Sequence, residues 1–213
     1  MAFDMRAGLL AGAHSLGLDL DERQADQLVA YAELLQKWSK AYNLTALRTP
    51  EEILTHHLLD SLSVVGPVLR HAQGRALRIM DTGSGAGLPG VVLAVCVPGV
   101  QVDCVDTVAK KAAFVQQVAG ALRIPTLRGV HARAESLAGP YDLVTSRAFA
   151  SLADFVAVTA QALASEGVWM AMKGKSPDAE RAALPPEVTV FHVEQLVVPG
   201  LDAERCLVWM RRA

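Results

Sequence analysis

The segment DTGSGAGLPG, residues 81–90, is the stretch of this sequence whose composition points most clearly to chemistry. It holds four glycines and one proline in ten positions, and it directly follows an apolar run that includes Ile79 and Met80. A glycine-rich turn between a strand and a helix exposes backbone N–H groups that can hold an anionic or polar ligand. The segment therefore predicts a ligand cradle. The alternative is a strand-to-helix turn that binds nothing.

Two interpretations of the cradle name different ligands. Residues 85–90 satisfy the GxGxxG pattern of dinucleotide-binding turns, and Asp106 stands where that pattern expects an acid for the ribose. Residues 81–87 also spell D-x-G-x-G-x-G, which resembles motif I of the class I S-adenosylmethionine methyltransferases. Both interpretations give Asp106 the ribose hydroxyls. They differ in the group that faces the start of the helix, a pyrophosphate or the smaller methionine carboxylate.

The elements that must position the cradle indicate an α/β fold with a Rossmann-like sheet. From Ala76 onward, short apolar runs alternate with helix-like segments, which is typical of βαβ units and a parallel sheet covered on both faces. Residues 188–198 and 205–211 have only PGLDAE between them, too short for a crossover helix, so we expect an antiparallel hairpin at one edge of the sheet. This hairpin favours the methyltransferase interpretation, because class I methyltransferases resemble a Rossmann sheet with an inserted antiparallel strand. A nicotinamide enzyme would also need a second half-site and an acid–base residue, for which the sequence offers no candidate.

The first third of the chain is predicted to be helical. Apolar residues recur at helical spacing over residues 3–16 and 22–39, and Asp19 or Asp21 is placed to cap the second of these helices. The helices should pack against the sheet as an N-terminal extension.

A third helix is expected after Thr49, which can cap it with Pro50 at the first helical position. The run that follows should end near Leu69, before a turn-prone segment. We therefore divide the chain into a helical extension over residues 1–74 and one compact methyltransferase domain over residues 75–213.

Composition limits the class of protein. With 213 residues, 52% of them hydrophobic and 20% charged, the chain is predicted to be globular. The net charge of −2 gives no global sign of nucleic-acid binding, so a basic face must be assembled by folding. Neither a membrane span nor a secretory signal is evident, so we expect a cytoplasmic protein. Cys96, Cys104 and Cys206 stand in apolar runs outside any CxxC pair, which favours buried reduced thiols.

Five strings, in order along the chain, carry a family resemblance. They are YNLTALRTPEEILTHHLLDSL, DTGSGAGLPGVVLA, TSRAFASL, MKGK and PGLDAERCLVWM. Together they resemble the GidB family of bacterial methyltransferases, from about Tyr31 to the carboxyl terminus. The resemblance implies that S-adenosylmethionine is the cofactor and that the target is N7 of guanine 527 in the 530 loop of 16S ribosomal RNA.

The resemblance also implies roles for particular residues. Arg147 and Lys173, just past two apolar strands, would be the catalytic groups. The residues implied in cofactor binding are Asp81, Gly83, Gly85, Gly87, Leu88, Asp106, Ala134, Glu135 and Arg147. The residues implied in contacts with the RNA are Asn43, His57, Asp60, Arg133, Arg147, Lys173 and Arg205. A helix cap at the strand end is the alternative for Asp106, and a solvated loop acid is the alternative for Glu135.

The chemistry of guanine N7 agrees with these residues. N7 carries an available lone pair at neutral pH, so catalysis can depend on positioning and electrostatics without a strong base or a catalytic thiolate. The spacing of His57 and Asp60 could suit a metal, but no third ligand is visible, and we expect none. The structural alternative is a buried polar link between Asp60 and Asn43. Phe149 could stack on a flipped base, although a place in the core is the stronger expectation.

Two other functions stay open at this point. One is a dinucleotide-dependent oxidoreductase, and the other is an RNA-binding module without catalysis. The expected partner is 16S ribosomal RNA, alone or within the small ribosomal subunit. We expect no membrane partner, and a monomer, since the sequence shows no extended heptad pattern or interface stripe.

Overall fold

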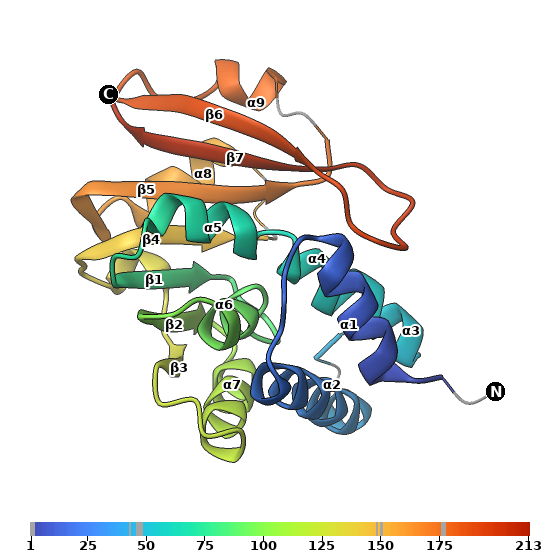
Figure 1. The fold of residues 1–213 in the computed structure, drawn as a ribbon. Helices are drawn as coiled ribbons and strands as arrows, with labels where there is room; N and C mark the ends of the chain where they lie inside the picture. The colour runs from blue at the N-terminus through green and yellow to red at the C-terminus, as the bar shows by residue number, and fades with distance from the viewer. Residues whose placement is uncertain (1–2, 43, 46–48, 148, 150, 176–177) are drawn as a thin grey trace.

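The computed structural model describes residues 3–42, 44–45, 49–147, 149, 151–175 and 178–213. Within these residues the chain forms a seven-stranded sheet with helices on both faces (Figure 1). The order of the strands is β3-β2-β1-β4-β5-β7-β6. The predicted α/β fold with a Rossmann-like sheet is confirmed.

The sheet brings five parallel strands and the start of an antiparallel strand to one edge. The strands are β1 (Leu77–Thr82), β2 (Val100–Asp106), β3 (Leu127–His131), β4 (Tyr141–Ser146), β5 (Leu163–Lys173), β6 (Val188–Leu196) and β7 (Arg205–Arg212). Strands β1 to β5 are parallel, and β7 pairs antiparallel with both β5 and β6. The predicted hairpin at the edge of the sheet is therefore confirmed. Because β7 runs in the opposite direction, its first residue lies beside the last residues of β5.

Two of the helices before the sheet begin at the caps that the sequence predicts. The helices before the sheet are α1 (Met5–Ser15), α2 (Glu22–Tyr42), α3 (Pro50–Ile53), the π-helical segment η1 (Leu54–Leu59), α4 (Asp60–Leu62) and α5 (Val65–Ala72). The Asp21 carboxylate accepts from the Gln24 N–H at 2.7 Å, and Thr49 forms a capping box with Glu52. The last of these helices continues three residues beyond the predicted end at Leu69, because it closes on Gln73, whose left-handed conformation (φ 50°) stops the helix.

Two hydrophobic cores lie on opposite faces of the sheet. The remaining helices are α6 (Gly90–Cys96), α7 (Ala109–Ala121), the short 3₁₀ turn η2 (Ala134–Ser136), α8 (Leu152–Thr159) and α9 (Asp178–Ala182). Neighbouring residues of β1 point to different cores, since Ile79 packs with α6, α7 and the N-terminal helices, and Met80 packs with α8. Leu28 of α2 shares the first core, so the helices before residue 75 and the sheet bury one continuous apolar surface.

Two structural findings bear on the class of protein. Cys96, Cys104 and Cys206 are buried free thiols, as predicted. None of the described helices combines the length and the apolar composition that a membrane span requires.

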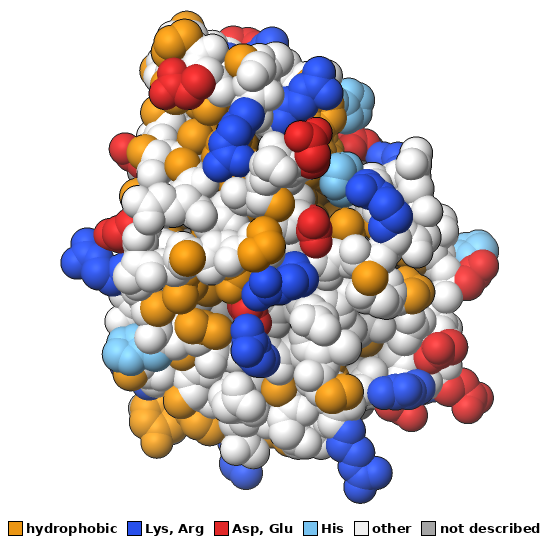
Figure 2. Space-filling view, turned by 90° about the vertical axis from the view of Figure 1, so that its left-hand side faces the viewer, with side chains coloured by type: hydrophobic (Ala, Val, Ile, Leu, Met, Phe, Trp, Pro, Cys, Tyr) orange, Lys and Arg blue, Asp and Glu red, His pale blue; other side chains and the backbone are white. Residues whose placement is uncertain are grey.

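Figure 2 shows the side where the parallel strands begin, and there basic side chains are interspersed with acidic and hydrophobic ones. Two arginines near these strand starts are engaged within the protein, since Arg128 pairs with Asp103 at 2.7 Å and Arg78 lies over the Tyr141 ring.

Close packing of α7 on β3 makes a matched pair of glycine substitutions informative. A Cβ at Gly129 would overlap the backbone carbonyl oxygen of Ala112 in α7, whereas a Cβ at Gly120 meets no atom within 4 Å. We expect Gly129→Ala to lower the free energy of unfolding by about 1–3 kcal/mol, through forced separation of helix and strand. Gly120→Ala, which only improves helix propensity, should raise it by up to about 1 kcal/mol. Urea denaturation of both variants tests this, and equal effects would contradict the packing described.

Candidate active site

The predicted cradle is a left-handed loop between β1 and α6. Gly83, Gly85 and Gly87 all adopt positive φ values, of 64°, 60° and 91°. At Gly87 an added Cβ would lie 2.7 Å from Val91, so the loop also packs tightly on the helix that follows it. At Gly85 no atom lies within 4 Å of the Cβ position, so the loop keeps open space on that side. The glycines therefore meet two separate needs, backbone conformation and close approach.

The Asp81 carboxylate connects the end of β1 to the start of α6 and so fixes the loop between them. Its Oδ2 accepts from the Gly90 N–H at 2.9 Å, at the first residue of α6. The carboxyl group is fully buried, and this burial raises its pKa to about 7 although the Gly90 N–H opposes the shift. Among the described residues, no group bonds to Asp81 Oδ1, nor to Oγ1 of Thr145, its register partner on β4. Two buried polar atoms are thus left beside the cradle.

Asp106 links the end of β2 to the cradle and keeps capacity for a ligand. Its Oδ2 accepts from the Gly85 N–H at 2.9 Å, and its Oδ1 accepts from the Val108 N–H at 2.8 Å. Asp106 does not cap α7, because the N-cap residue of that helix is Val108, and no described side chain caps the first turn there. Each carboxylate oxygen still has a second lone pair, so Asp106 can also accept a hydroxyl group. It ends β2, next to the strand that leads into the cradle.

A tyrosine from the N-terminal helices completes the support of the cradle. The Tyr31 hydroxyl donates to the backbone oxygen of Ala86 at 2.9 Å, and the Tyr31 side chain is fully buried. Sequence reasoning missed this residue, because its apolar surroundings in α2 look like any core position. The only available signal was an aromatic residue with a polar end inside an amphipathic helix.

The 3₁₀ turn η2 follows β3, the strand that pairs with β2. Ala134 is buried there, whereas Glu135 is exposed and pairs with Arg133 at 3.0 Å. A bond to its own backbone N–H and the Arg133 guanidinium lower the pKa of Glu135. Leu88, which follows Gly87 in the glycine loop, is buried in the core, so it shapes the loop and does not face solvent.

These residues fit S-adenosylmethionine. Open space at Gly85, a carboxylate at the end of β2 and two buried polar atoms without a partner among the described residues provide room and polar contacts. The chain would hold the methionine end against the backbone N–H groups of the loop and the ribose against Asp106.

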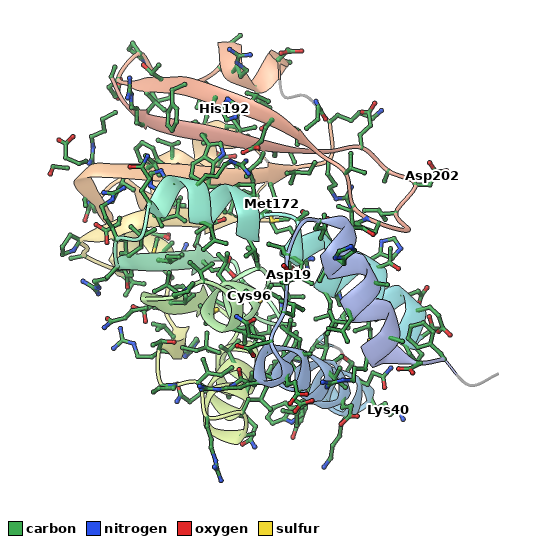
Figure 3. All side chains as sticks on the ribbon, in the orientation of Figure 1. Asp19, Lys40, Cys96, Met172, His192 and Asp202 are labelled. Carbon is green, nitrogen blue, oxygen red and sulfur yellow. The ribbon has the colours of Figure 1, made fainter. Side chains whose placement is uncertain are left out.

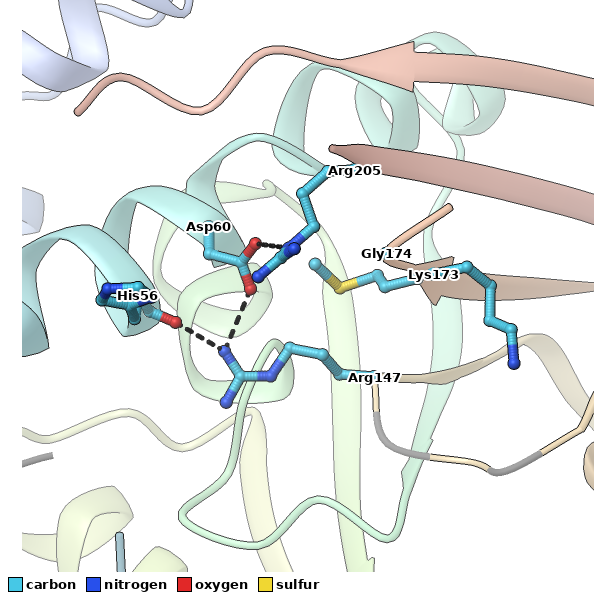
Figure 4. A pocket seen from close by; sticks show the side chains of 7 residues that line it. His56, Asp60, Arg147, Lys173, Gly174 and Arg205 are labelled. Atoms are coloured by element: carbon cyan, nitrogen blue, oxygen red, sulfur yellow. Dashed lines mark hydrogen bonds and ion pairs between the residues drawn. The ribbon is translucent and has the colours of Figure 1, made fainter. Parts of the chain in front are cut away.

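A second feature, a pocket of about 310 Å³, opens at the ends of β4, β5 and β7 (Figure 4). The residues that line it are His56, Asp60, Arg147, Met172, Lys173, Gly174 and Arg205. Figure 3 places Met172 where the sheet meets the N-terminal helices. The pocket therefore brings together four of the residues predicted on the RNA side, from four separate parts of the chain.

Arg147 and Arg205 both bind Asp60 at the pocket. Arg147 Nη1 donates to Asp60 Oδ2 at 3.2 Å and to the backbone oxygen of His56 at 3.1 Å. Arg205 Nε donates to Asp60 Oδ1 at 2.8 Å. The expected link between Asp60 and Asn43 stays a prediction, because Asn43 lies outside the described residues.

His57 brings no charge to this region near neutral pH. Burial and the Arg147 guanidinium lower its pKa to about 4. Its Nε2 lies 2.8 Å from Thr45 Oγ1. Among the described residues, no three His, Cys, Asp or Glu side chains come together as a metal site would require.

Three predicted residues lie apart from the two arginines. Lys173 lines the pocket, but its side chain points away from Arg147 (Figure 4), and Nζ lies 2.9 Å from a Glu180 carboxylate oxygen. Arg133 follows β3, which is separated from β4 by β1 and β2 in the sheet, and does not line the pocket. Phe149 is half-buried and its ring contacts Phe155, in agreement with a place at the edge of the core.

The raised pKa of Asp81 predicts how stability depends on pH. Folding binds a proton between about pH 4, where the carboxyl group ionises in the unfolded chain, and about pH 7, where it ionises in the folded one. The contribution of Asp81 to the free energy of unfolding should therefore fall as pH rises through this window. In Asp81→Asn, measured without added ligand, this fall should be missing. Parallel stability curves for the two proteins between pH 4 and pH 7 would contradict the assignment.

Comparisons with known proteins identify the family of the chain. The chain matches the family described as GidB, rRNA small subunit methyltransferase G, over residues 24–208. Ribosomal RNA small subunit methyltransferase G of Acidovorax ebreus is 62% identical over 211 residues, which cover 95% of this chain and 93% of the relative. The protein of the same name from Leptothrix cholodnii is 59% identical over 207 residues, 97% of this chain and 95% of the relative.

Solved structures of more distant proteins share the fold. A TehB-like SAM-dependent methyltransferase from Corynebacterium glutamicum superposes with a TM-score of 0.55 at 15% identity, over 87% of this chain and 99% of that one. TrmN from Thermus thermophilus gives a TM-score of 0.58 at 18% identity, over 72% of this chain and 49% of that one. The sheet order, the cradle and these likenesses agree on the class I S-adenosylmethionine methyltransferase fold. With the family match over most of its length, the chain belongs to the GidB family, the small-subunit ribosomal RNA methyltransferases G.

Proposed function

We propose that this protein transfers the methyl group of S-adenosylmethionine to N7 of guanine 527 in the 530 loop of 16S ribosomal RNA. The observation that carries the proposal is the position of two features at one edge of the sheet. The cradle lies at the ends of β1 and β2, and the arginine-lined pocket lies at the ends of β4, β5 and β7. A nucleotide in the pocket would therefore lie beside a cofactor in the cradle.

The chain supplies positioning and charge for this reaction. The bound cofactor supplies an electrophilic methyl group on a sulfonium, and the N7 lone pair needs no prior loss of a proton. The protein therefore has to align the guanine and exclude competing orientations. A covalent route through a thiolate is disfavoured, because burial raises the pKa of Cys96 to about 12 and also raises the pKa values of Cys104 and Cys206.

The basic side chains of the pocket suit an RNA substrate. Arg147 and Arg205 can each present a guanidinium to a phosphate or to the O6 of the target guanine. Lys173 can exchange its contact with Glu180 for a contact with RNA phosphate. We assign Arg147 and Lys173 as the groups nearest the reacting base, and Arg133 to more distant RNA, with His57 behind the pocket.

The setting of the reaction is part of the proposal. The substrate is the RNA within the small ribosomal subunit or one of its assembly intermediates, and the enzyme acts in the cytoplasm as a monomer. We also propose a division into a helical extension over residues 1–74 and a methyltransferase domain over residues 75–213. The extension contributes to cofactor binding, since Tyr31 supports the cradle.

The direct test is methyl transfer from tritiated S-adenosylmethionine to small ribosomal subunits isolated from cells that lack the native enzyme. We expect label at N7 of one guanine in the 530 loop, mapped by chemical cleavage at the modified nucleotide. Label elsewhere, or none on either subunits or naked 16S RNA, would overturn the substrate. Stabilisation of the protein by NAD in place of S-adenosylmethionine would favour the oxidoreductase instead.

Arg147 and Asp106 should separate catalysis from cofactor binding. Arg147→Ala is expected to lower turnover about 100-fold, because it removes a positioned charge, with little change in cofactor affinity. Asp106→Ala should weaken cofactor affinity by about 10- to 100-fold, because it removes an ionised hydrogen-bond acceptor. Calorimetric titration and single-turnover methylation measure the two effects.

The exposed Arg23 of α2 provides a control, since Arg23→Ala should change neither quantity. Equal loss of cofactor affinity in Arg147→Ala and Asp106→Ala would contradict this division of roles.

A further inference from the structure

A buried carboxylate connects two arginines that the sheet alone would leave independent. Arg147 follows β4 and Arg205 begins β7, and β5 lies between these strands. With neighbouring strands about 4.8 Å apart, the two arginine backbones start about 10 Å from each other. Asp60 bridges this gap with one oxygen for each guanidinium, at 3.2 Å and 2.8 Å (Figure 4). The side chains therefore converge above the end of β5.

Exposure separates the role of the carboxylate from that of the arginines. The Asp60 side chain is 3% exposed, whereas Arg147 and Arg205 are each 25% exposed. A nucleic acid that enters the pocket can reach the guanidinium groups but not the carboxylate behind them. Asp60 therefore acts on a substrate through the arginines.

The local helix geometry aims Asp60 at the pocket. The preceding segment η1 is π-helical, and the Asp60 N–H reaches back five residues to the Thr55 carbonyl. The same segment presents the His56 carbonyl oxygen to Arg147 Nη1, at 3.1 Å. Wide turns of this kind recur at functional sites. Arg147 is thus fixed by two acceptors on one helical segment.

The bridge leaves donors available on both arginines. Within the described part of the chain, Arg147 Nε and Arg205 Nη2 have no hydrogen-bond acceptor, while the other guanidinium nitrogens bond to Asp60, His56, His57 or Glu204. We propose that Asp60 is a positioning residue that holds Arg147 and Arg205 at a fixed spacing, so that together they receive an anionic oxygen of the RNA. This assignment rests on the proposed function for the identity of the substrate. The bridge itself can be tested without substrate.

Stability alone does not account for this arrangement. A buried ion pair as a whole contributes little net stability, because desolvation of the charges offsets their attraction. Removal of Asp60 alone would leave two arginines that are each 25% exposed, so water can solvate their charges. Without the carboxylate, two like charges would face each other across the pocket and move apart. The bridge therefore matters most for geometry, and its loss should appear in the use of substrate more than in folding.

The first test is Asp60→Asn, which keeps the shape of the side chain and removes its charge. We expect the KM for small ribosomal subunits to rise about tenfold, with cofactor affinity and melting temperature close to those of the wild type. Asp202→Asn is the matched control, because Asp202 lies exposed in the loop between β6 and β7 (Figure 3). This variant should leave KM unchanged.

A double-mutant cycle then separates positioning from direct contact. Arg205→Ala should raise KM in the wild-type background and have a much smaller effect in the Asp60→Asn background, because the arginine is already displaced there. Equal effects of Arg205→Ala in the two backgrounds would overturn the proposal. A loss of cofactor affinity and melting temperature in Asp60→Asn that matches the loss of activity would also overturn it, in favour of a purely structural role.

A spectroscopic measurement keeps the test independent of activity. In nitrogen-15 NMR of the wild-type protein, the Arg205 Nε–H should exchange with solvent more slowly than that of exposed Arg23, because it donates to Asp60. Exchange as fast as at Arg23 would show that the bridge does not form. A slow Arg205 signal together with no methylation of subunits would instead place the failure in the proposed substrate.

Discussion

The left-handed backbone of the glycine loop cannot hold its shape alone, and most of the architecture serves to hold it. Three side chains from separate elements fix the loop: Asp81 beneath it, Asp106 from the neighbouring strand and Tyr31 from α2. The contact from Tyr31 requires the N-terminal helices to pack on the sheet, in agreement with the core that Leu28 of α2 shares with Ile79 of β1. Loop, sheet and helices are therefore stabilised together.

The pocket at the ends of β4 and β5 depends on local charge and not on the net charge of the chain. The whole chain carries a formal charge of −2, yet two arginines converge on one buried carboxylate at the pocket, and Lys173 also lines it. Arg128 and Asp103 form a similar pair at the opposite edge, where the carboxylate is bound by the Arg128 guanidinium through both oxygens and also by the Tyr141 hydroxyl. Arg128 is thus compensated within the protein, whereas the two arginines at the pocket are held partly open. This contrast shows how a mildly acidic protein can present the basic pocket that we propose for RNA.

The sequence predicts best those features that depend on residues close together in the chain. The glycine loop, the acid at the end of β2, the caps at Asp21 and Thr49 and the terminal hairpin all follow from short patterns, and all are present. The partners of Asp60 lie 87 and 145 residues away, and no local pattern encodes such pairs. The same holds for Tyr31 and for the contact of Lys173 with Glu180, since periodicity predicts which face is buried but not which polar group it meets.

The position of β7 between β5 and β6 has a consequence for biosynthesis. Strand β6 is made first but pairs only with β7, so it has no hydrogen-bonded neighbour until β7 has left the ribosome. Arg205 arrives with that same strand and completes the pocket. A nascent chain can thus shape its cofactor cradle before Arg205 is made, while the basic pocket forms only after β7 has emerged. Until then, the chain would meet the ribosome that makes it with the arginine pair of the pocket incomplete.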